Sequence, residues 1–312
     1  MSNSVSHKLY IIVESAYGTT PSTPTMVEIP ITGCTFSVGI NQLLSETIRS
    51  DRQLVDVRNG TRSVTGDITA ELQYGVLDDL LEAATCGTWA TDTPSAGIDQ
   101  LKPGTTKRSF SVLRHFTDLG SGDNPYELYT GVEIASMAIT AGAEQISSVS
   151  FSVVGQNVTF SDSAPSGSTL TDVDAVAGFD AFTGALNEGG SALGTATEFS
   201  ISLENGQEPR FVIGATTTIE PELKKSNLTG SISTHFEDHA QLTKFVGDTK
   251  SNTDITLTDP AGNTLYFEVP NFLYTGGQPD VSGESDVILS LPYQAIYDAT
   301  TSTNLIIQRN PA

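Results

Sequence analysis

The sequence predicts a mainly-β protein built from two tandem β-sandwich or β-barrel units, each with a long hairpin and one short flanking helix. Threonine, serine, glycine and valine are abundant, and this composition favours strands and turns over helices. Apolar residues alternate with small or polar ones, for example at Phe36, Val38 and Ile40, as in a half-buried strand. One pattern also occurs twice, as TRSVTGDITAELQYGVLDDLLE at 61–82 and as KSNLTGSISTHFEDHAQLTK at 225–244. Such internal similarity indicates a repeated structural unit.

The two copies of the pattern align on a Thr-Gly pair. With Gly66 placed on Gly230, the apolar positions coincide: Ile68 with Ile232, Leu72 with Phe236, and Leu81 with Phe245. Each copy then enters a short segment with helical spacing, whose apolar side chains should pack into a core. These candidate core residues are Val76, Leu77, Leu80, Leu81, Leu242 and Phe245.

The repeat suggests where the units begin and end. Residues 1–160 form the first unit, and residues 197–312 form the second. Between them, residues 161–196 are acidic and rich in Gly, Ser and Ala, which is typical of a linker or an extended arm. The repeat weakens after the helix, so there we expect common architecture without a fixed register.

Three hairpins are expected. In the first, 47–58 reaches the favoured two-residue turn Asn59-Gly60 and 61–72 returns. In the second, 210–220 and 226–236 flank a turn at 221–225. In the third, 129–140 and 146–154 are joined around Ala141-Gly142.

The formal net charge of −22 on 312 residues is the strongest compositional signal. It argues against a nucleic-acid grip, which needs clustered Lys and Arg to neutralise phosphates. Two interpretations stay open: an ordinary solvated acidic surface, or a surface that DNA passes without sticking. The chain has no Lys or Arg between Arg114 and Arg210, whereas four arginines gather at 49–62.

Enzyme, metal and cofactor functions are not predicted. His235 and His239 flank Glu237, but a zinc peptidase needs the glutamate directly after the first histidine of HExxH. The pair Asp78-Asp79 at a helix start fits charge–dipole complementarity better than acid–base chemistry. Cys34 and Cys86 are expected to be small buried residues, with one disulfide as the alternative. No apolar run approaches the length of about 20 residues that a membrane helix needs, and the N-terminus is not a signal peptide, so we expect assembly in a host cytoplasm.

Several stretches resemble the major tail tube proteins of long-tailed (siphovirus-type) bacteriophages. They are ESAYGTTPSTP at 14–24, the 45–72 hairpin, DDLLEA at 78–83, VGQN at 154–157 and LENGQEPRFVIG at 203–214. The resemblance covers nearly the whole chain except 161–196. It implies tail-tube-type β units, six to a ring, whose inner strands form one barrel, and rings that stack into a tube conducting DNA into the host. It also implies a place in the virion tail beside the tape measure, tail tip and terminator proteins, with genomic DNA as a cargo that does not stick.

The duplication adds an expectation about symmetry. If a ring holds six units, two units per chain favour a trimeric ring with pseudo-sixfold symmetry, and the alternative is a ring of six chains. The long hairpins are then candidates for the luminal, ring-forming surface. Their candidate residues are Thr47, Arg49, Arg52, Arg58, Arg62, Thr65, Asp67, Arg210, Glu220, Thr229, Ser231 and Thr234. The rival function is a tandem β-sandwich binding module, such as an adhesin or a virion decoration protein.

Overall fold

The computed structural model describes residues 3–174, 176–279 and 286–312 of the chain. The prediction of a mainly-β fold is confirmed. A short 3₁₀ helix (Ser4–Ser6) precedes the first strand. The first half of the chain then contains helix α1 (Asp78–Thr85) and the strands β1 (His7–Val13), β2 (Thr25–Ile29), β3 (Gly33–Leu44), β4 (Val57–Glu71), β5 (Asp99–Leu101), β6 (Phe110–Phe116), β7 (Tyr126–Gly142), β8 (Ser148–Gly155) and β9 (Asn157–Ser161).

The second half follows without a long unstructured break. Its elements are β10 (Thr169–Thr171), β11 (Asp180–Glu188), β12 (Ser191–Ala192), β13 (Ala196–Glu204), β14 (Asn227–His235), α2 (Ala240–Val246), β15 (Ser251–Thr258), β16 (Thr264–Tyr274), β17 (Ile288–Ala295) and β18 (Ile306–Asn310). Three of these strands lie inside the segment expected to be a linker or arm. Of these, β10 pairs in parallel with β2, and β11 pairs with β15.

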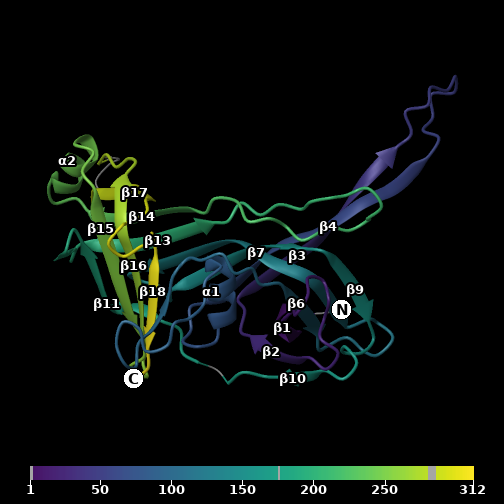
Figure 1. The fold of residues 1–312 in the computed structure, drawn as a ribbon, viewed down its shortest axis with the longest axis horizontal. Coiled ribbons are helices and arrows are strands. Elements are labelled where there is room, and N and C mark those ends of the chain that lie inside the picture. The colour runs from purple at the N-terminus through teal and green to yellow at the C-terminus, as the bar shows by residue number, and fades with distance from the viewer. Residues whose placement is uncertain (1–2, 175, 280–285) are drawn as a thin grey trace.

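One antiparallel sheet runs through both halves in the order β3-β4-β8-β7-β13-β14-β17-β16. The two halves meet where β7 pairs with β13, from Gly142 opposite Glu198 to Ser136 opposite Glu204. Figure 1 shows this sheet crossing the width of the molecule, with the remaining strands forming a lobe at each end.

The strand order of the first half, β3-β4-β8-β7, corresponds to β13-β14-β17-β16 in the second. The outer strands correspond as well. Strand β7 also pairs with β6 and β9, and β16 also pairs with β15 and β18. Likewise, β1 pairs with β6, and β11 pairs with β15. A single large hydrophobic core contains side chains from both halves, including Phe151, Phe199 and Phe267.

The expected turn at Asn59-Gly60 is wrong. Both residues lie inside β4, and the strand opposite them is β3, so the connecting loop is 45–56. The register shifts between Ile40 and Gln42, which pair with Arg62 and Asn59. The Asn-Gly pair therefore lies at a β-bulge. Glycine is common at bulges because a side chain there would crowd the neighbouring strand.

The expected strand at 210–220 is also wrong. Strand β14 pairs with β13, and residues 205–226 between them form an arm with only isolated bridges, Arg210 with Ile219 and Arg62 with Thr217. Pro209, Pro221 and two glycines with positive φ, Gly206 and Gly214, interrupt any ladder there. The third expected hairpin is confirmed by the pairing of β7 with β8, but its turn is 143–147, because Ala141 and Gly142 still lie in β7, where they pair with β13.

The two helices differ in burial. Leu77, Leu80 and Leu81 are buried around α1, and Val76 is half-buried against the same core. No residue of α2 is buried; Leu242 and Phe245 are half-buried. The first helix therefore has the expected core position, whereas the second lies at the surface.

Candidate functional site: a hydroxyl face and two arms

The central sheet has one apolar face and one face covered mainly by small hydroxyl side chains. The register places Thr35 opposite Asp67, and Asp67 opposite Ser152. Across the join of the two halves it places Thr140 opposite Ser200. We call the resulting surface the hydroxyl face. We define it as Thr35, Ser37, Thr65, Asp67, Thr69, Glu71, Ser136, Ala138, Thr140, Ser148, Ser150, Ser152, Glu198, Ser200, Ser202, Glu204, Thr229, Ser231, Ser233, Ser290, Pro292 and Gln294; at its margins the register adds Val154, Asn227, His235 and Ile288.

The charges on the hydroxyl face are all negative. Asp67, Glu71, Glu198 and Glu204 are its ionisable side chains, and the face so defined carries no Lys or Arg. Neighbouring side chains bond to one another, since the Ser152 hydroxyl donates to Asp67 Oδ1 at 2.5 Å. Ser200 Oγ and Ser231 Oγ lie 2.9 Å apart. The face can bind water through its hydroxyls, and it offers a polyanion no cation to pair with.

The predicted luminal residues do not all lie together. Thr65, Asp67, Thr229 and Ser231 lie on the hydroxyl face. Thr234 points to the opposite face, where it is buried beside Thr195. The remaining ones are on the arms or the outer part of β4: Thr47, Arg49, Arg52, Arg58, Arg62, Arg210 and Glu220.

Sequence reasoning missed most of the hydroxyl face, including the serines of β8 and β13. The available signal was the strict alternation of serine with apolar residues in SVSFSV at 148–153 and FSISL at 199–203. Alternation shows which side chains share a face within one strand. It does not show which strands are neighbours, and that is what makes the face continuous.

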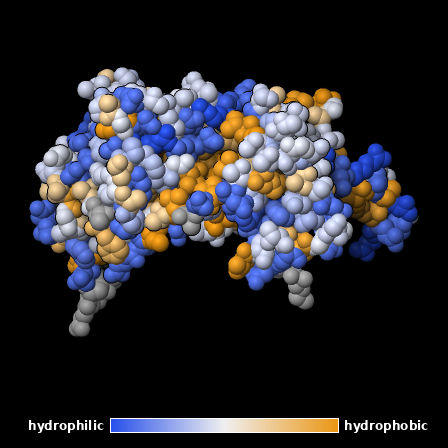
Figure 2. All heavy atoms as spheres, turned by 90° about the horizontal axis from the view of Figure 1, so that it is seen from below, coloured by the Kyte–Doolittle hydropathy of each residue, from blue (hydrophilic) through white to orange (hydrophobic). Residues whose placement is uncertain are grey.

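The β3–β4 arm, residues 40–62, projects from the body of the protein (Figure 1). Ion pairs within it join Arg49 to Asp51 at 2.6 Å and Arg58 to Asp56 at 2.7 Å. Figure 2 shows hydrophobic and hydrophilic atoms side by side on this projection. Its exposed apolar residues are Ile40, Leu43, Leu44, Ile48, Leu54, Val55 and Val57. An arm with so much exposed apolar surface is typical of a protein–protein contact.

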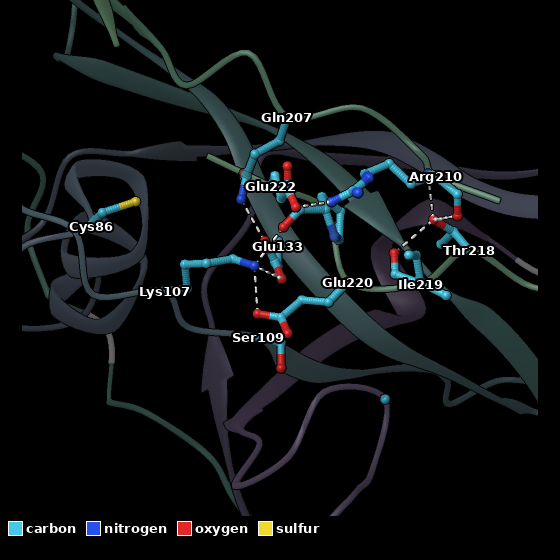
Figure 3. A network of polar contacts seen from close by, with 12 residues as sticks. Cys86, Lys107, Ser109, Glu133, Gln207, Arg210, Thr218, Ile219, Glu220 and Glu222 are labelled. Carbon is cyan, nitrogen blue, oxygen red and sulfur yellow. Dashed lines mark hydrogen bonds and ion pairs between the residues drawn. The ribbon is translucent and has the colours of Figure 1, made fainter. Parts of the chain in front are cut away.

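The second arm, residues 205–226, is held against the first half by a polar network (Figure 3). Lys107 Nζ bonds to Glu220 Oε1 and to the carbonyl of Pro221, each at 2.5 Å, and lies 3.8 Å from Glu133 Oε1. Gln207 Nε2 donates to Glu133 Oε2 at 2.5 Å. The arm is therefore attached to β7 through Glu133 at one end and to Lys107 at the other.

Glu133 is the buried carboxyl of this network, with a side chain only 2% exposed. Burial raises its pKa from 4.5 to about 7. The negative charges of Glu220 and Glu14 add to this rise, while Lys107 and the hydrogen bond from Gln207 oppose it. Gln207 Oε1 is buried and has no hydrogen-bond partner in this orientation of the amide. The carboxyl proton of a protonated Glu133 would give this oxygen a donor.

This pKa predicts that the free energy of unfolding falls as pH rises from about 5 to 7.5. The native state binds the Glu133 proton more tightly than the unfolded state, so its stabilising effect is full below pH 4.5 and is lost through pH 7. The contribution of this group is on the order of 3–4 kcal/mol, from about 1.4 kcal/mol per pKa unit over the rise from 4.5 to about 7. Urea unfolding at several pH values measures it.

Glu133→Gln should flatten this pH dependence, because the amide does not titrate. Glu144→Gln, at an exposed position in the loop between β7 and β8, is the matched control and should leave the slope unchanged. Equal slopes for Glu133→Gln and the wild type would show that Glu133 is not the titrating group.

The residues considered for metal chemistry do not form a site. His235 ends β14, and His239 precedes α2, where its ring contacts Phe236 edge-on at 5.1 Å. In the described part of the chain, no three His, Cys, Asp or Glu side chains are grouped as metal ligands. Cys34 and Cys86 are free thiols; Cys86 is buried as expected, whereas Cys34 is only half-buried. Among the helices described, none is both long enough and apolar enough to span a bilayer.

A continuous polar sheet face and an exposed apolar arm are features of a structural protein that assembles through its surfaces. Comparison with models of known families matches residues 5–295 to the phage tail tube proteins. The chain belongs to the phage tail tube protein family, and it is a structural protein of the phage tail. A search of the curated proteins found no match.

Proposed function

We propose that copies of this chain join edge to edge into rings, that the rings stack into the tail tube, and that the hydroxyl face lines the bore through which DNA is ejected. The main support for this proposal is the β7–β13 pairing, which joins the two halves into one sheet with one continuous hydroxyl face. Among the described residues, strand β3 pairs with β4 alone, so a further strand can join at its other edge.

The chemistry of the hydroxyl face supports passage without binding. Tight DNA binding depends on phosphates displacing counterions from Lys and Arg. The hydroxyl face offers small hydroxyls and four carboxylates instead. DNA in such a bore would stay hydrated and weakly repelled, so it could slide.

The matching strand orders support two equivalent units per chain, with boundaries near 160 and 197. Since the family resemblance implies six units per ring, the ring would contain three chains with pseudo-sixfold symmetry. The further partners of this role are the tape measure, tail tip and terminator proteins, with assembly in the host cytoplasm.

Mass measurement of assembled particles tests the stoichiometry. We expect purified chain, supplied with a tail-tip initiator, to form tubes whose mass per ring, measured by scanning transmission electron microscopy, equals three chains. Six chains per ring would contradict the trimer but keep the tube. A chain that stays monomeric at high concentration with the initiator present would contradict the tube itself.

A further inference from the structure

We infer that the exposed C-terminal end of α2 is a docking site for the base of the β3–β4 arm of a second copy of this chain. The inference rests on the proposed ring and names the side chains that meet in it. It comes from comparing the two halves of the chain. The end of α1 in the first half is covered by the second half, whereas the end of α2 in the second half has no following half in the same chain to cover it.

The two helices end in the same way, which fixes the corresponding residues. After α1, Cys86 has φ 51° and its N–H donates to Ala83 O, while Gly87 N–H donates to Glu82 O. After α2, Asp248 has φ 49° and donates to Phe245 O, while Thr249 donates to Lys244 O. Both ends are the same left-handed cap. Val246 therefore occupies the position of Ala84, and Phe245 that of Ala83. The expected match of Leu81 with Phe245 is thus wrong by two residues, because the segment between strand and helix is two residues longer in the first half.

The end of α1 is covered by the second half of the chain. Asn205, at the base of the second arm, donates from Nδ2 to Ala84 O at 2.7 Å. Ala84 is 1% exposed and Asn205 is 4% exposed. Leu203, the last buried apolar residue of β13, is 1% exposed. This contact is a template for how one unit seats on the helix of the unit before it.

The strand register identifies the residues at the base of the β3–β4 arm that correspond to this template. Gly66 pairs with Phe36, and Gly230 pairs with Ile201. Counting two and four residues onward, Val38 corresponds to Leu203, and Ile40 corresponds to Asn205.

Both surfaces of the second contact are open in the single chain. Ile40 is 47% exposed and Val246 is 78% exposed, whereas their counterparts are buried. No hydrogen bond from the described residues reaches the carbonyl of Val246. In the contact between two copies, Ile40 would pack on Val246. This apolar contact would stand where the contact within the chain has the Asn205–Ala84 hydrogen bond.

The equivalence of the two contacts supports a second copy as the occupant. Within the chain, the end of α1 is covered by the base of the arm of the following half, through Asn205. The end of α2 has no following half in the same chain, so the equivalent segment, the base of the β3–β4 arm, would come from a second copy. Head-to-tail association of this kind generates a closed ring.

Crosslinking between two marked populations tests this contact. Chains carrying Ile40→Cys are mixed with differently tagged chains carrying Val246→Cys, assembled into tubes, and treated with a short bis-maleimide. We expect crosslinks between the two tags in tubes and none in unassembled protein. Val5→Cys, at a valine near the N-terminus that is more exposed than Ile40, replaces Ile40→Cys in the control mixture and should not link.

A chain carrying both cysteines tests whether the contact lies within one ring. Its crosslinked products should stop at the number of chains per ring. Tubes that form normally but never link Ile40→Cys to Val246→Cys would overturn the docking site and leave the proposed function standing. Products that extend past one ring would also overturn it. If wild-type chain forms neither rings nor tubes, the docking site and the proposed function both fail.

Placing opposite charges at the two apolar positions gives a second test, with the yield of tubes as the readout. Val246→Glu should lower the yield of tubes at least tenfold, because it would bury an unpaired carboxylate, while thermal unfolding of the monomer stays unchanged at this exposed site. Ile40→Lys alone should do the same, and the double variant should recover most of the yield. Equal tube yields for Val246→Glu and the wild type would contradict the contact.

Discussion

Tubes with lysine at Ser150, Ser200 and Ser231 should retain double-stranded DNA, whereas wild-type tubes release it. These serines lie on β8, β13 and β14, in the middle of the hydroxyl face. Each lysine would add a cation to every chain around the bore. A protein with six to ten phosphate contacts loses roughly 10³–10⁵ in affinity between 50 and 200 mM salt, and the lysine tubes should show a loss of that order.

DNA retention by assembled tubes, measured across that salt range, gives the result, and the same substitutions in phage should slow ejection. The matched control is glutamine at the same three positions, which lengthens the side chains without adding charge. Glutamine tubes that behave like lysine tubes would indicate narrowing of the bore rather than charge. Lysine tubes that release DNA as the wild type does would mean that this face is not in the bore.

Gly66→Ala and Gly230→Ala should each prevent stable folding. A Cβ atom at Gly66 would lie 2.8 Å from Phe36 Cα and would clash with the carbonyl of Thr35. At Gly230 it would clash with the Tyr293 hydroxyl and the carbonyl of Ser200. The backbone of a paired strand cannot give way as a flexible side chain can, so we expect a loss of about 4 kcal/mol or more at each site.

Urea unfolding of the purified variants, or their soluble yield, measures this effect. Gly39→Ala is the matched control in the same hairpin, since its Cβ would meet the nearest atom, Ser63 O, at 3.8 Å. We expect Gly39→Ala to unfold within about 1 kcal/mol of the wild type. A Gly66→Ala variant as stable as Gly39→Ala would contradict the close strand approach that explains the repeated Thr-Gly pair.

Local features of the sequence predicted local structure well. Alternation at Phe36 and Val38 identified a half-buried strand, and the spacing of Leu77, Leu80 and Leu81 identified a helix with a buried face. The family resemblance, which drew on several short stretches of sequence, is confirmed by the family match over residues 5–295. Each of these signals depends on residues close together in sequence.

Features that depend on distant partners were missed. Asn59-Gly60 has the composition of a tight turn, but β3 and β4 run past it, and only their register shows that it forms a bulge. The side chains of α2 have helical spacing like those of α1, yet no residue of α2 is buried, whereas Asn205 from the second half of the chain covers the end of α1. The hydroxyl face exists because β7 pairs with β13, and no short window of sequence contains both strands.

The large negative net charge of the chain is not concentrated on the hydroxyl face. Carboxylates are a minority of the hydroxyl face, where serine and threonine dominate. A bore of this kind would work mainly by lacking cations, with the acidic surplus elsewhere on the surface.

Electron cryo-microscopy of assembled tubes, viewed along the tube axis, shows directly whether the hydroxyl face lines the bore. We expect β4 and β14 to lie in the wall of the bore with Thr65, Asp67, Thr229 and Ser231 facing its centre. We also expect β3 of each chain to join the sheet of the neighbouring chain. A reconstruction in which the hydroxyl face points outward, or is covered by another subunit, would mean that this face does not line the bore.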